Sequence, residues 1–335
     1  MGRLRSIVSD KLPNHLEMTP MGPARPHEED LAKIDLDAFY RDLQLRGLAK
    51  VTRDVTKRIV RRYCAWSLSR GVDPKESQRE DLLEYLGDMR ARELGQTSLR
   101  KVFSCLSVWF AYLEEVGEIE RNPVPPIQKK YLRSYKDEVR QRQLISVEEA
   151  AKMIGATVDT RDRAILMLLF KTGIRRTELT TLDLDDIDLH DLTLMLKPTA
   201  KRSNRDLFID VETALVLQRW LRQREMRYIK NGAERALFIG HDGCRLQGTG
   251  VVNAVTQAAE RVGLHNRKSK RLDEHFTPHC CRHWFTTHLR RAGMPREFIQ
   301  ELRGDVRREA IDIYDHIDRK ELKESYLAHI PQLGV

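Results

Sequence analysis

A stretch near the end of the chain carries residue types that could perform chemistry on a phosphate. It runs from His279 to His316 and reads HCCRHWFTTHLRRAGMPREFIQELRGDVRREAIDIYDH. His279 and Arg282 are three residues apart, so they share one face if the stretch is helical. An imidazole beside a permanently charged, planar guanidinium suits a phosphate group. Tyr314, close to the end of the stretch, is then a candidate nucleophile for attack on that phosphate.

The composition of the chain favours a polyanionic partner. The 335 residues carry 59 Lys and Arg against 50 Asp and Glu, a formal net charge of +9 and a pI near 9.3. Such a basic excess favours a nucleic acid, although a soluble surface of mixed charge would give the same totals. The length predicts two domains, and the 41% hydrophobic content is enough to build ordinary cores.

The five cysteines indicate a reducing compartment rather than a disulfide framework. No CxxC pair occurs, and the adjacent Cys280 and Cys281 are poorly placed to bond to each other. Together with His279 and His283 they could be imagined as zinc ligands. Adjacent cysteines point in different directions on a helix, however, and no second pair lies at ligand spacing. Because no apolar run reaches the length of a membrane span and no signal-peptide core is present, we expect a soluble cytoplasmic, intracellular protein.

The N-terminal part of the sequence predicts an arm, a helical domain and a linker. Residues 1–27 contain several prolines and no sustained periodicity, which predicts a flexible arm. Residues 28–122 show helical periodicity, including a helix starting at Thr52 whose crowded basic residues could contact phosphates or simply be solvated. Residues 123–143 open with a cluster of prolines, expected to break any helix, and are basic, so we interpret them as a linker.

The rest of the chain, residues 144–335, predicts a mainly helical second domain with a small antiparallel β-sheet. Helical patterns begin at Ser146 and break at Gly173. Alternating apolar residues at 192–196 and 207–209 predict a hairpin with a basic tip. The chain ends in an amphipathic helix that carries Tyr326 on its apolar stripe.

Three segments of the second domain together resemble the tyrosine recombinases of the phage-integrase and Xer type. TGIRRTEL resembles the first arginine box of that family, TPHCCRHWFTTHL its His-x-x-Arg box, and LRGDVRREAIDIYDHI its nucleophile box. The resemblance covers about residues 28–330, with the boxes in order at workable separations. It implies a C-shaped, two-domain DNA clamp, in which a helical, SAM-like core-binding domain precedes a catalytic domain with a C-terminal helix.

The resemblance assigns roles in cutting and rejoining DNA at specific sites. Tyr314 would attack the scissile phosphorus, form a 3′-phosphotyrosyl link and release a 5′-hydroxyl. Arg175 and Arg282 would hold the non-bridging oxygens, whose charge grows in the transition state. His279 would donate to the phosphate or help to move the tyrosine proton.

Two further positions complete the implied site. Lys201 on the hairpin would protonate the leaving 5′-oxygen, with Lys197 as the alternative, and Glu178 would tether the turn that carries Arg175. Because the covalent link conserves the energy of the phosphodiester, the mechanism requires no metal, nucleotide or other cofactor.

Asp305 departs from the family pattern. The family usually has His or Trp after the glycine of its last box, whereas Asp305 follows Gly304 here. An ionised carboxylate beside a phosphate repels it. Asp305 would therefore face away, be held by a neighbouring arginine such as Arg307 or Arg308, or accept a proton from the site. We keep it as a site residue, with reduced activity as the hypothesis.

The partner implied by the resemblance is double-stranded DNA, bound by a homotetramer, since strand exchange needs a cut on each strand of two duplexes. Neither a membrane nor a small-molecule substrate is expected. Two alternatives remain open at this point: a catalytically weakened DNA-binding protein of the same fold, and a topoisomerase-like DNA-relaxing enzyme. Tyr326 is the rival tyrosine, interpreted as a packing anchor or as part of a helix that docks on a neighbouring protomer.

Overall fold

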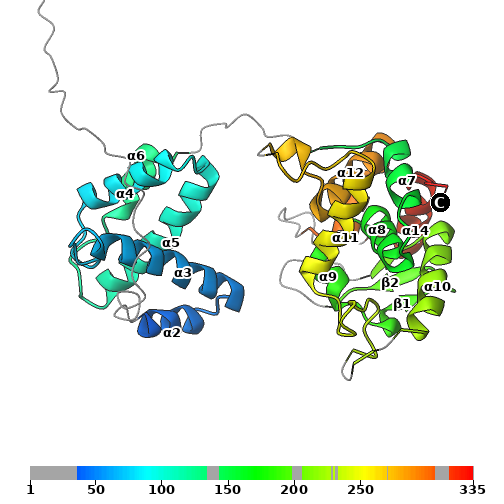
Figure 1. Cartoon of the computed structure of the whole chain (residues 1–335), viewed down its shortest axis with the longest axis horizontal. Coiled ribbons are helices and arrows are strands. Elements are labelled where there is room, and N and C mark those ends of the chain that lie inside the picture. The colour runs from blue at the N-terminus through cyan, green and yellow to red at the C-terminus, as the bar shows by residue number, and fades with distance from the viewer. Residues whose placement is uncertain are drawn as a thin grey trace, which may run out of the picture. The chain divides into compact units, whose positions relative to one another are not determined.

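The computed structural model describes residues 36–133, 143–197, 206–227, 229–230, 233–269, 271–305 and 317–334. The chain divides into two compact units, Met1–Glu138 and Val139–Val335, each with its own hydrophobic core (Figure 1). The core-binding function of the first unit stays a prediction, as does the clamp arrangement. No described helix combines the length and the apolarity that a membrane span requires.

The first unit is a small bundle of helices. They are α2 (Asp37–Leu45), α3 (Lys50–Leu68), α4 (Arg79–Ala91), α5 (Gln96–Glu115) and α6 (Val124–Tyr131). Tyr63 of α3 is fully buried, and its ring contacts the rings of Tyr85 and Phe110 from α4 and α5. Aromatic packing at this point therefore ties three helices together.

Helix α6 differs from the sequence expectation, which placed a helix-free linker there. Pro125 and Pro126 lie in its first turn, where an amide hydrogen is not needed for the helical hydrogen bonds. Val124 and Ile127 are buried against the first unit's core. The beginning of the predicted linker is therefore helical and belongs to the first unit, whereas residues 134–142 lie outside the described part.

The basic helix predicted to start at Thr52 is α3, which begins at Lys50 and has Ala49 as its N-cap. Arg58, Arg61 and Arg62 are exposed on it. These three side chains are accessible to a partner from solution. Their contact with DNA phosphates stays a prediction.

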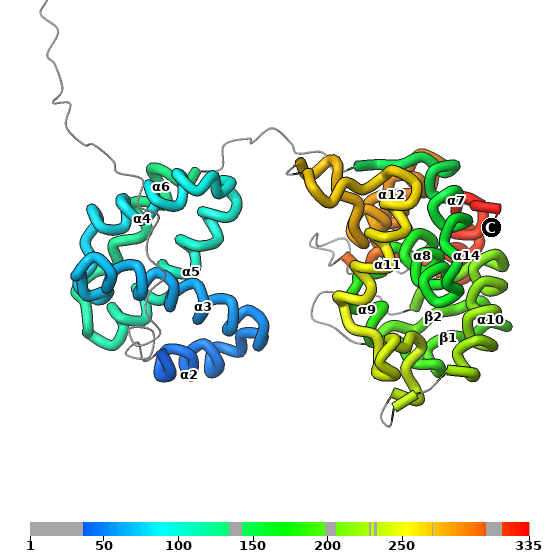
Figure 2. The backbone as a smooth tube through the Cα atoms, viewed as in Figure 1, coloured from blue at the N-terminus to red at the C-terminus, as the bar shows by residue number. Residues whose placement is uncertain are grey.

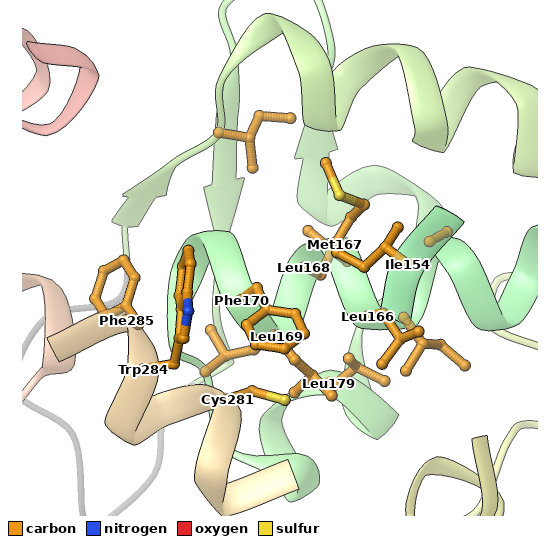
Figure 3. Packing of buried hydrophobic residues seen from close by; sticks show 14 of the residues in the cluster. Ile154, Leu166, Met167, Leu168, Leu169, Phe170, Leu179, Cys281, Trp284 and Phe285 are labelled. Carbon is orange, nitrogen blue, oxygen red and sulfur yellow. The ribbon is translucent and has the colours of Figure 1, made fainter. Parts of the chain in front are cut away.

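The second unit is built around α8 (Thr160–Thr172), in which every residue from Ala164 to Thr172 is buried. Asp159 caps its start by accepting hydrogen bonds from two backbone amides, and Gly173 ends it in the left-handed conformation. Helices from its own neighbourhood and from distant parts of the sequence pack against α8 (Figure 2). They are α7 (Val147–Gly155), α10 (Val211–Glu225), α11 (Gly248–Arg261) and α12 (Pro278–Arg291). In Figure 3, Trp284 of α12 lies beside Phe170 of α8.

A three-stranded antiparallel sheet lies beside these helices. Strands β1 (Ile187–Asp188), β2 (Thr193–Met195) and β3 (Asp206–Phe208) are in the order β1-β2-β3, with Leu194 opposite Leu207. The predicted hairpin is therefore confirmed as β2 and β3, while its basic tip at 198–205 lies outside the described residues. The strand expected at 236–239 is reduced to isolated bridges, one of them between Asp183 and Ala236.

The remaining elements complete a mainly helical unit and confirm the predicted fold class. They are α9 (Arg176–Thr181), η1 (Leu184–Asp186), η2 (Leu272–Glu274), α13 (Arg296–Arg303) and α14 (Arg319–His329). Helix α14 packs into the core of its own chain, where Tyr326 is buried and its hydroxyl donates to the backbone oxygen of Lys171 at 3.0 Å. Tyr326 is thus a packing anchor, as predicted.

Candidate active site

A cavity of about 350 Å³ brings together three of the predicted site residues, Arg175, His279 and Arg282. Its wall is formed by the turn before α9, by α11 and by the first turn of α12. The lining residues are Ile174, Arg175, Arg176, Val252, Thr277, Pro278, His279 and Arg282. Three arginines and a histidine therefore line one open space, which is a suitable arrangement for binding an oxyanion.

The start of α12 positions His279 and Arg282. Thr277 is the N-cap and Pro278 occupies the first helical position, which its fixed φ favours. His279 is exposed on the first turn, and Arg282 lies one turn later on the same helix, as the spacing predicted. The helix N-terminus adds a partial positive charge to this end of the cavity.

Arg282 is buried and held by backbone carbonyls. Its Nη1 donates to the oxygen of Gly173 at 2.6 Å, and its Nη2 donates to the oxygen of Arg303 at 3.0 Å. Only 6% of the side chain is exposed. These bonds fix the plane of the guanidinium before any ligand arrives, so that little reorganisation is needed on binding.

The turn before α9 positions Arg175. Gly173 has φ +60°, and a Cβ on it would come within 2.4 Å of the ring of Phe285, so only glycine fits between α8 and α12. The backbone amide of Arg175 donates to Glu178 Oε2 at 2.6 Å, and its Nη1 donates to Oε1 at 2.9 Å. Glu178 is buried, which agrees with the tethering role predicted for it.

Asp305 contacts the same arginines. Its Oδ1 accepts a hydrogen bond from Arg282 Nη2 at 3.1 Å and lies 3.7 Å from Arg175 Nη2. Its Oδ2 lies 3.0 Å from Arg303 Nε. Of the arrangements considered from the sequence, the carboxylate held by arginine is the one observed. The expected partners Arg307 and Arg308 lie outside the described residues.

Of the remaining predicted site residues, some are described by the structure and others are not. Lys201 and Tyr314 lie outside the described residues, so their roles stay predictions. Lys197, the alternative to Lys201, ends the described part of the hairpin, and its Nζ lies 2.5 Å from Asp183 Oδ2. Asp183 also pairs with Arg245, and although burial acts to raise the pKa of the Asp183 carboxyl, these two cations lower it overall.

Two arginines of the site were not selected from the sequence. Arg176, which is exposed at the start of α9, also lines the cavity. Arg303 supplies a backbone acceptor to Arg282 and a guanidinium to Asp305. The signal for Arg303 was its place two residues before Asp305 in the segment LRGD.

The two adjacent cysteines are buried where α12 packs, and neither is among the residues that line the cavity. Cys281 is buried in the core next to Trp284 and Phe285 (Figure 3), and burial raises the pKa of its thiol well above the usual value. Cys280 is buried as well, and its Sγ accepts from the amide of Thr277 at 3.4 Å. Their side chains therefore serve the core and the helix cap.

Comparisons with known proteins show the family of the chain. The model of the phage integrase family matches residues 137–321. A tyrosine recombinase XerC of Alcanivorax borkumensis is 31% identical over 243 residues, covering 71% of this chain and 74% of that relative. A tyrosine recombinase XerC of Stutzerimonas stutzeri is 28% identical over 304 residues, covering 87% and 94%.

Solved structures of similar fold come from integrases. The Tn1549 transposon integrase in complex with transposon right end DNA has a TM-score of 0.62 and 17% identity, covering 87% of this chain and 99% of that chain. A lambda integrase dimer bound to a COC′ core site has a TM-score of 0.61 and 18% identity, covering 85% and 97%. At these identities the likeness concerns the fold.

The mainly helical fold with a small sheet is shared with these solved integrases. The chain belongs to the phage integrase family of tyrosine recombinases. It is a tyrosine-type site-specific recombinase that acts on DNA.

Proposed function

We propose that this recombinase cuts and rejoins DNA through a 3′-phosphotyrosyl intermediate formed by Tyr314 at the arginine-lined cavity. The observation that carries the proposal is the convergence of Arg175, His279 and Arg282 on that cavity. Two fixed guanidinium groups would bind the two non-bridging oxygens of a scissile phosphate and stabilise the charge that develops on them. Such preorganised donors are worth about 100-fold to 1,000-fold in rate each.

The proposed steps balance without an added reagent. The Tyr314 oxygen attacks phosphorus, the bond from phosphorus to the 5′-oxygen breaks, and the tyrosine proton is taken up by a base. His279, exposed on the first turn of α12, would move that proton or donate to the phosphate. Lys201 would give a proton to the leaving 5′-oxygen, with Lys197 as the alternative. Attack by a 5′-hydroxyl then reverses these steps and rejoins the strand.

The proposed substrate is double-stranded DNA, and the proposed assembly is a homotetramer on two duplexes. The lambda integrase described above was solved as a dimer bound to a core site, which supports DNA-bound assembly for this fold. We expect the protein to act in the cytoplasm on the nucleoid. The basic excess of the chain supports a polyanionic partner.

The proposal is tested with suicide DNA substrates nicked near the recombination site. Wild type should give a covalent protein–DNA band on a denaturing gel, and Tyr314→Phe should give none. Tyr326→Phe is the matched control, since the buried hydroxyl of Tyr326 has a pKa raised well above its usual value by burial, with the nearby Asp210 adding to the shift. A band that survives in Tyr314→Phe would overturn the assignment of the nucleophile.

A second function is favoured by one observation, the contact of Asp305 with both cavity arginines. A carboxylate at this position would weaken phosphate binding, as expected of a DNA-binding protein with impaired catalysis. Specific DNA binding by the wild type without a covalent band, together with a band that is restored in Asp305→His, would favour that function. Relaxation of supercoiled DNA by a monomer without sequence preference would instead identify the topoisomerase-like alternative.

A further inference from the structure

The carboxylate of Asp305 contacts two of the arginines that line the cavity, Arg175 and Arg282. A single atom, Oδ1, is 3.1 Å from Arg282 Nη2 and 3.7 Å from Arg175 Nη2. The other oxygen, Oδ2, is 3.0 Å from Arg303 Nε. One oxygen shared by two guanidinium groups is the contact that a non-bridging phosphate oxygen would make.

The backbone at Asp305 is anchored while its side chain remains accessible. Gly304 ends α13 with φ +60°, and the amide of Asp305 donates to the oxygen of Gln300 at 3.2 Å. The Asp305 side chain is 34% exposed, against 6% for Arg282. Rotation about the Asp305 side-chain bonds is therefore enough to withdraw the carboxylate, whereas Arg282 stays fixed by the carbonyls of Gly173 and Arg303.

We infer that Asp305 is a built-in competitor of the DNA phosphate. Without DNA, its carboxylate occupies the anion site of Arg175 and Arg282 and offsets part of their positive charge. A scissile phosphate displaces it, because two anions cannot share one pair of guanidinium groups. The inference rests on the proposed function, since it assigns regulation to the same site.

The competition has a consequence for specificity. A phosphate that enters the site must first offset the contacts that Asp305 gives up. Its apparent affinity is therefore the intrinsic affinity multiplied by the fraction of molecules in which Asp305 has left the arginines. DNA held by many other contacts overcomes this reduction, whereas DNA bound weakly at random does not. Asp305 thereby acts against cleavage of unintended sequences.

The experiment compares wild type with Asp305→Asn, which keeps the shape of the side chain and removes its charge. The melting temperature is followed as inorganic phosphate is titrated at constant ionic strength, which gives a phosphate affinity without any DNA. We expect Asp305→Asn to bind phosphate about tenfold more tightly, and to reach half-maximal covalent adduct at about tenfold lower suicide-DNA concentration.

Asp185→Asn is the matched control. Asp185 is an exposed carboxylate paired with Arg235, outside the cavity, and its loss changes the net charge by the same amount. A general charge effect would strengthen DNA binding in both variants, whereas competition at the cavity changes only Asp305→Asn. If Asp305→Asn does not fold, as judged by circular dichroism, Asp305→Ser gives the same comparison.

The outcomes separate the inference from the proposed function. Equal or weaker phosphate binding by Asp305→Asn would overturn the inference, because Asp305 would then only position the arginines. Tighter phosphate binding without a covalent adduct in any variant would support the competitor and contradict the proposed chemistry. Tighter phosphate binding together with adduct formation at lower DNA concentration would support both.

Discussion

The two cavity arginines differ in how the protein holds them. Arg282 is buried and donates to two backbone carbonyls, so it is part of the packing between α8, α12 and α13 as well as a charge. Arg175 is 29% exposed and is held by Glu178, a side chain of its own turn. A rigid group and a tethered group therefore line the same cavity, and neither could be replaced by lysine without losing the fork geometry.

The hydrogen bonds from Arg175 to Glu178 lead to a prediction for a change at Glu178. In Glu178→Gln, the pairing with the Arg175 guanidinium loses its charge, and the arginine samples other orientations. We expect the rate of covalent adduct formation at saturating DNA to fall about tenfold to 100-fold, as is common for residues that orient a functional group. DNA affinity measured by fluorescence anisotropy should change little.

A control separates this orientation effect from loss of folding. Glu149→Gln alters another carboxylate that accepts a hydrogen bond from a helix cap, at Ser146, away from the cavity. It should leave the adduct rate unchanged. An equal loss of rate in both variants would mean that stability, and not the orientation of Arg175, governs the result.

At the residue scale, the sequence predicted those site residues that spacing and charge define. His279 and Arg282 could be placed together because a spacing of three on a helix leaves little choice. The partners of Asp305 could not be predicted, since they depend on the way α13 returns toward α12. Arg307 and Arg308, which follow Asp305 in the sequence, were named as examples of possible partners. The observed partners are Arg303, two residues before Asp305, and Arg175 and Arg282 from segments brought to it by packing.

The turn that links α8 to α9 is the element on which the cavity depends. Gly173 supplies the backbone oxygen that holds Arg282 and lies two residues before Arg175. Its left-handed conformation and its contact with Phe285 leave no room for a side chain. The end of one buried helix therefore sets the position of both arginines.

We predict that Gly173→Ala destabilises the protein and impairs the site. A non-glycine residue at positive φ costs about 1–2 kcal/mol, and the clash with Phe285 adds a comparable amount, for a total of about 3 kcal/mol. Gly263→Ala is the control, because Gly263 also has positive φ but a Cβ there meets nothing within 4 Å. Chemical denaturation should show a clearly smaller loss for the control. Equal losses would mean that the Phe285 contact is unimportant.

The opposite side of α8 holds the C-terminal segment. Lys171 is fully buried and pairs with Asp210 and Glu212 at 2.6 Å each, and its Nζ also donates to the oxygen of Pro331 at 2.7 Å. The carboxyl of Asp210 is subject to opposing effects: burial acts to raise its pKa, while Lys171 and Thr213 lower it, and the net shift is downward. This cluster keeps the end of the chain on its own core.

The lowered pKa of Asp210 predicts a loss of stability in acid. A carboxyl whose pKa is depressed on folding stabilises the protein above its unfolded pKa, and this contribution is lost as the pH falls through the folded pKa. The free energy of unfolding should therefore decline as the pH is lowered below about 4. In Asp210→Asn the decline should be shallower, on top of a loss of about 2–3 kcal/mol at neutral pH. A decline as steep as that of wild type would contradict this role.

At the element scale, local signals predicted helices and the hairpin well, but missed features that depend on neighbours. The capping box at Ser146 and the stop at Gly173 are both present. Helix α6 was missed because prolines were interpreted as breakers, although two prolines in a first turn are compatible with a helix. The strand expected near 236–239 has too few pairing partners and remains as isolated bridges.

At the scale of the whole molecule, the chain consists of two units with separate cores, and the cavity lies wholly in the second. Helix α3 of the first unit presents exposed Arg58, Arg61 and Arg62, which are suited to neutralising phosphates. Binding and chemistry would then be divided between the units: the first adds affinity, and the second contacts the scissile phosphate.

This division predicts the salt dependence of binding. Replacing Arg58 and Arg61 by Gln should reduce the slope of the logarithm of DNA affinity against that of salt concentration by about 1–2, since each lost phosphate contact contributes about 0.9. Replacing Arg219 and Arg222, an exposed pair at the same spacing on α10, serves as the control and should leave the slope nearly unchanged. Equal changes in the two variants would mean that the first unit has no special part in binding.

The most direct test of the central claim asks whether the cavity arginines neutralise the scissile phosphate. Covalent adduct formation is measured with Arg175→Ala and Arg282→Ala on a normal suicide substrate and on one whose scissile phosphate is replaced by an uncharged methylphosphonate. On the normal substrate each variant should lose about 100-fold to 1,000-fold in rate. On the uncharged substrate, which has no charge to neutralise, the loss should largely disappear. Equal losses on both substrates would contradict the claim that this cavity holds the reacting phosphate.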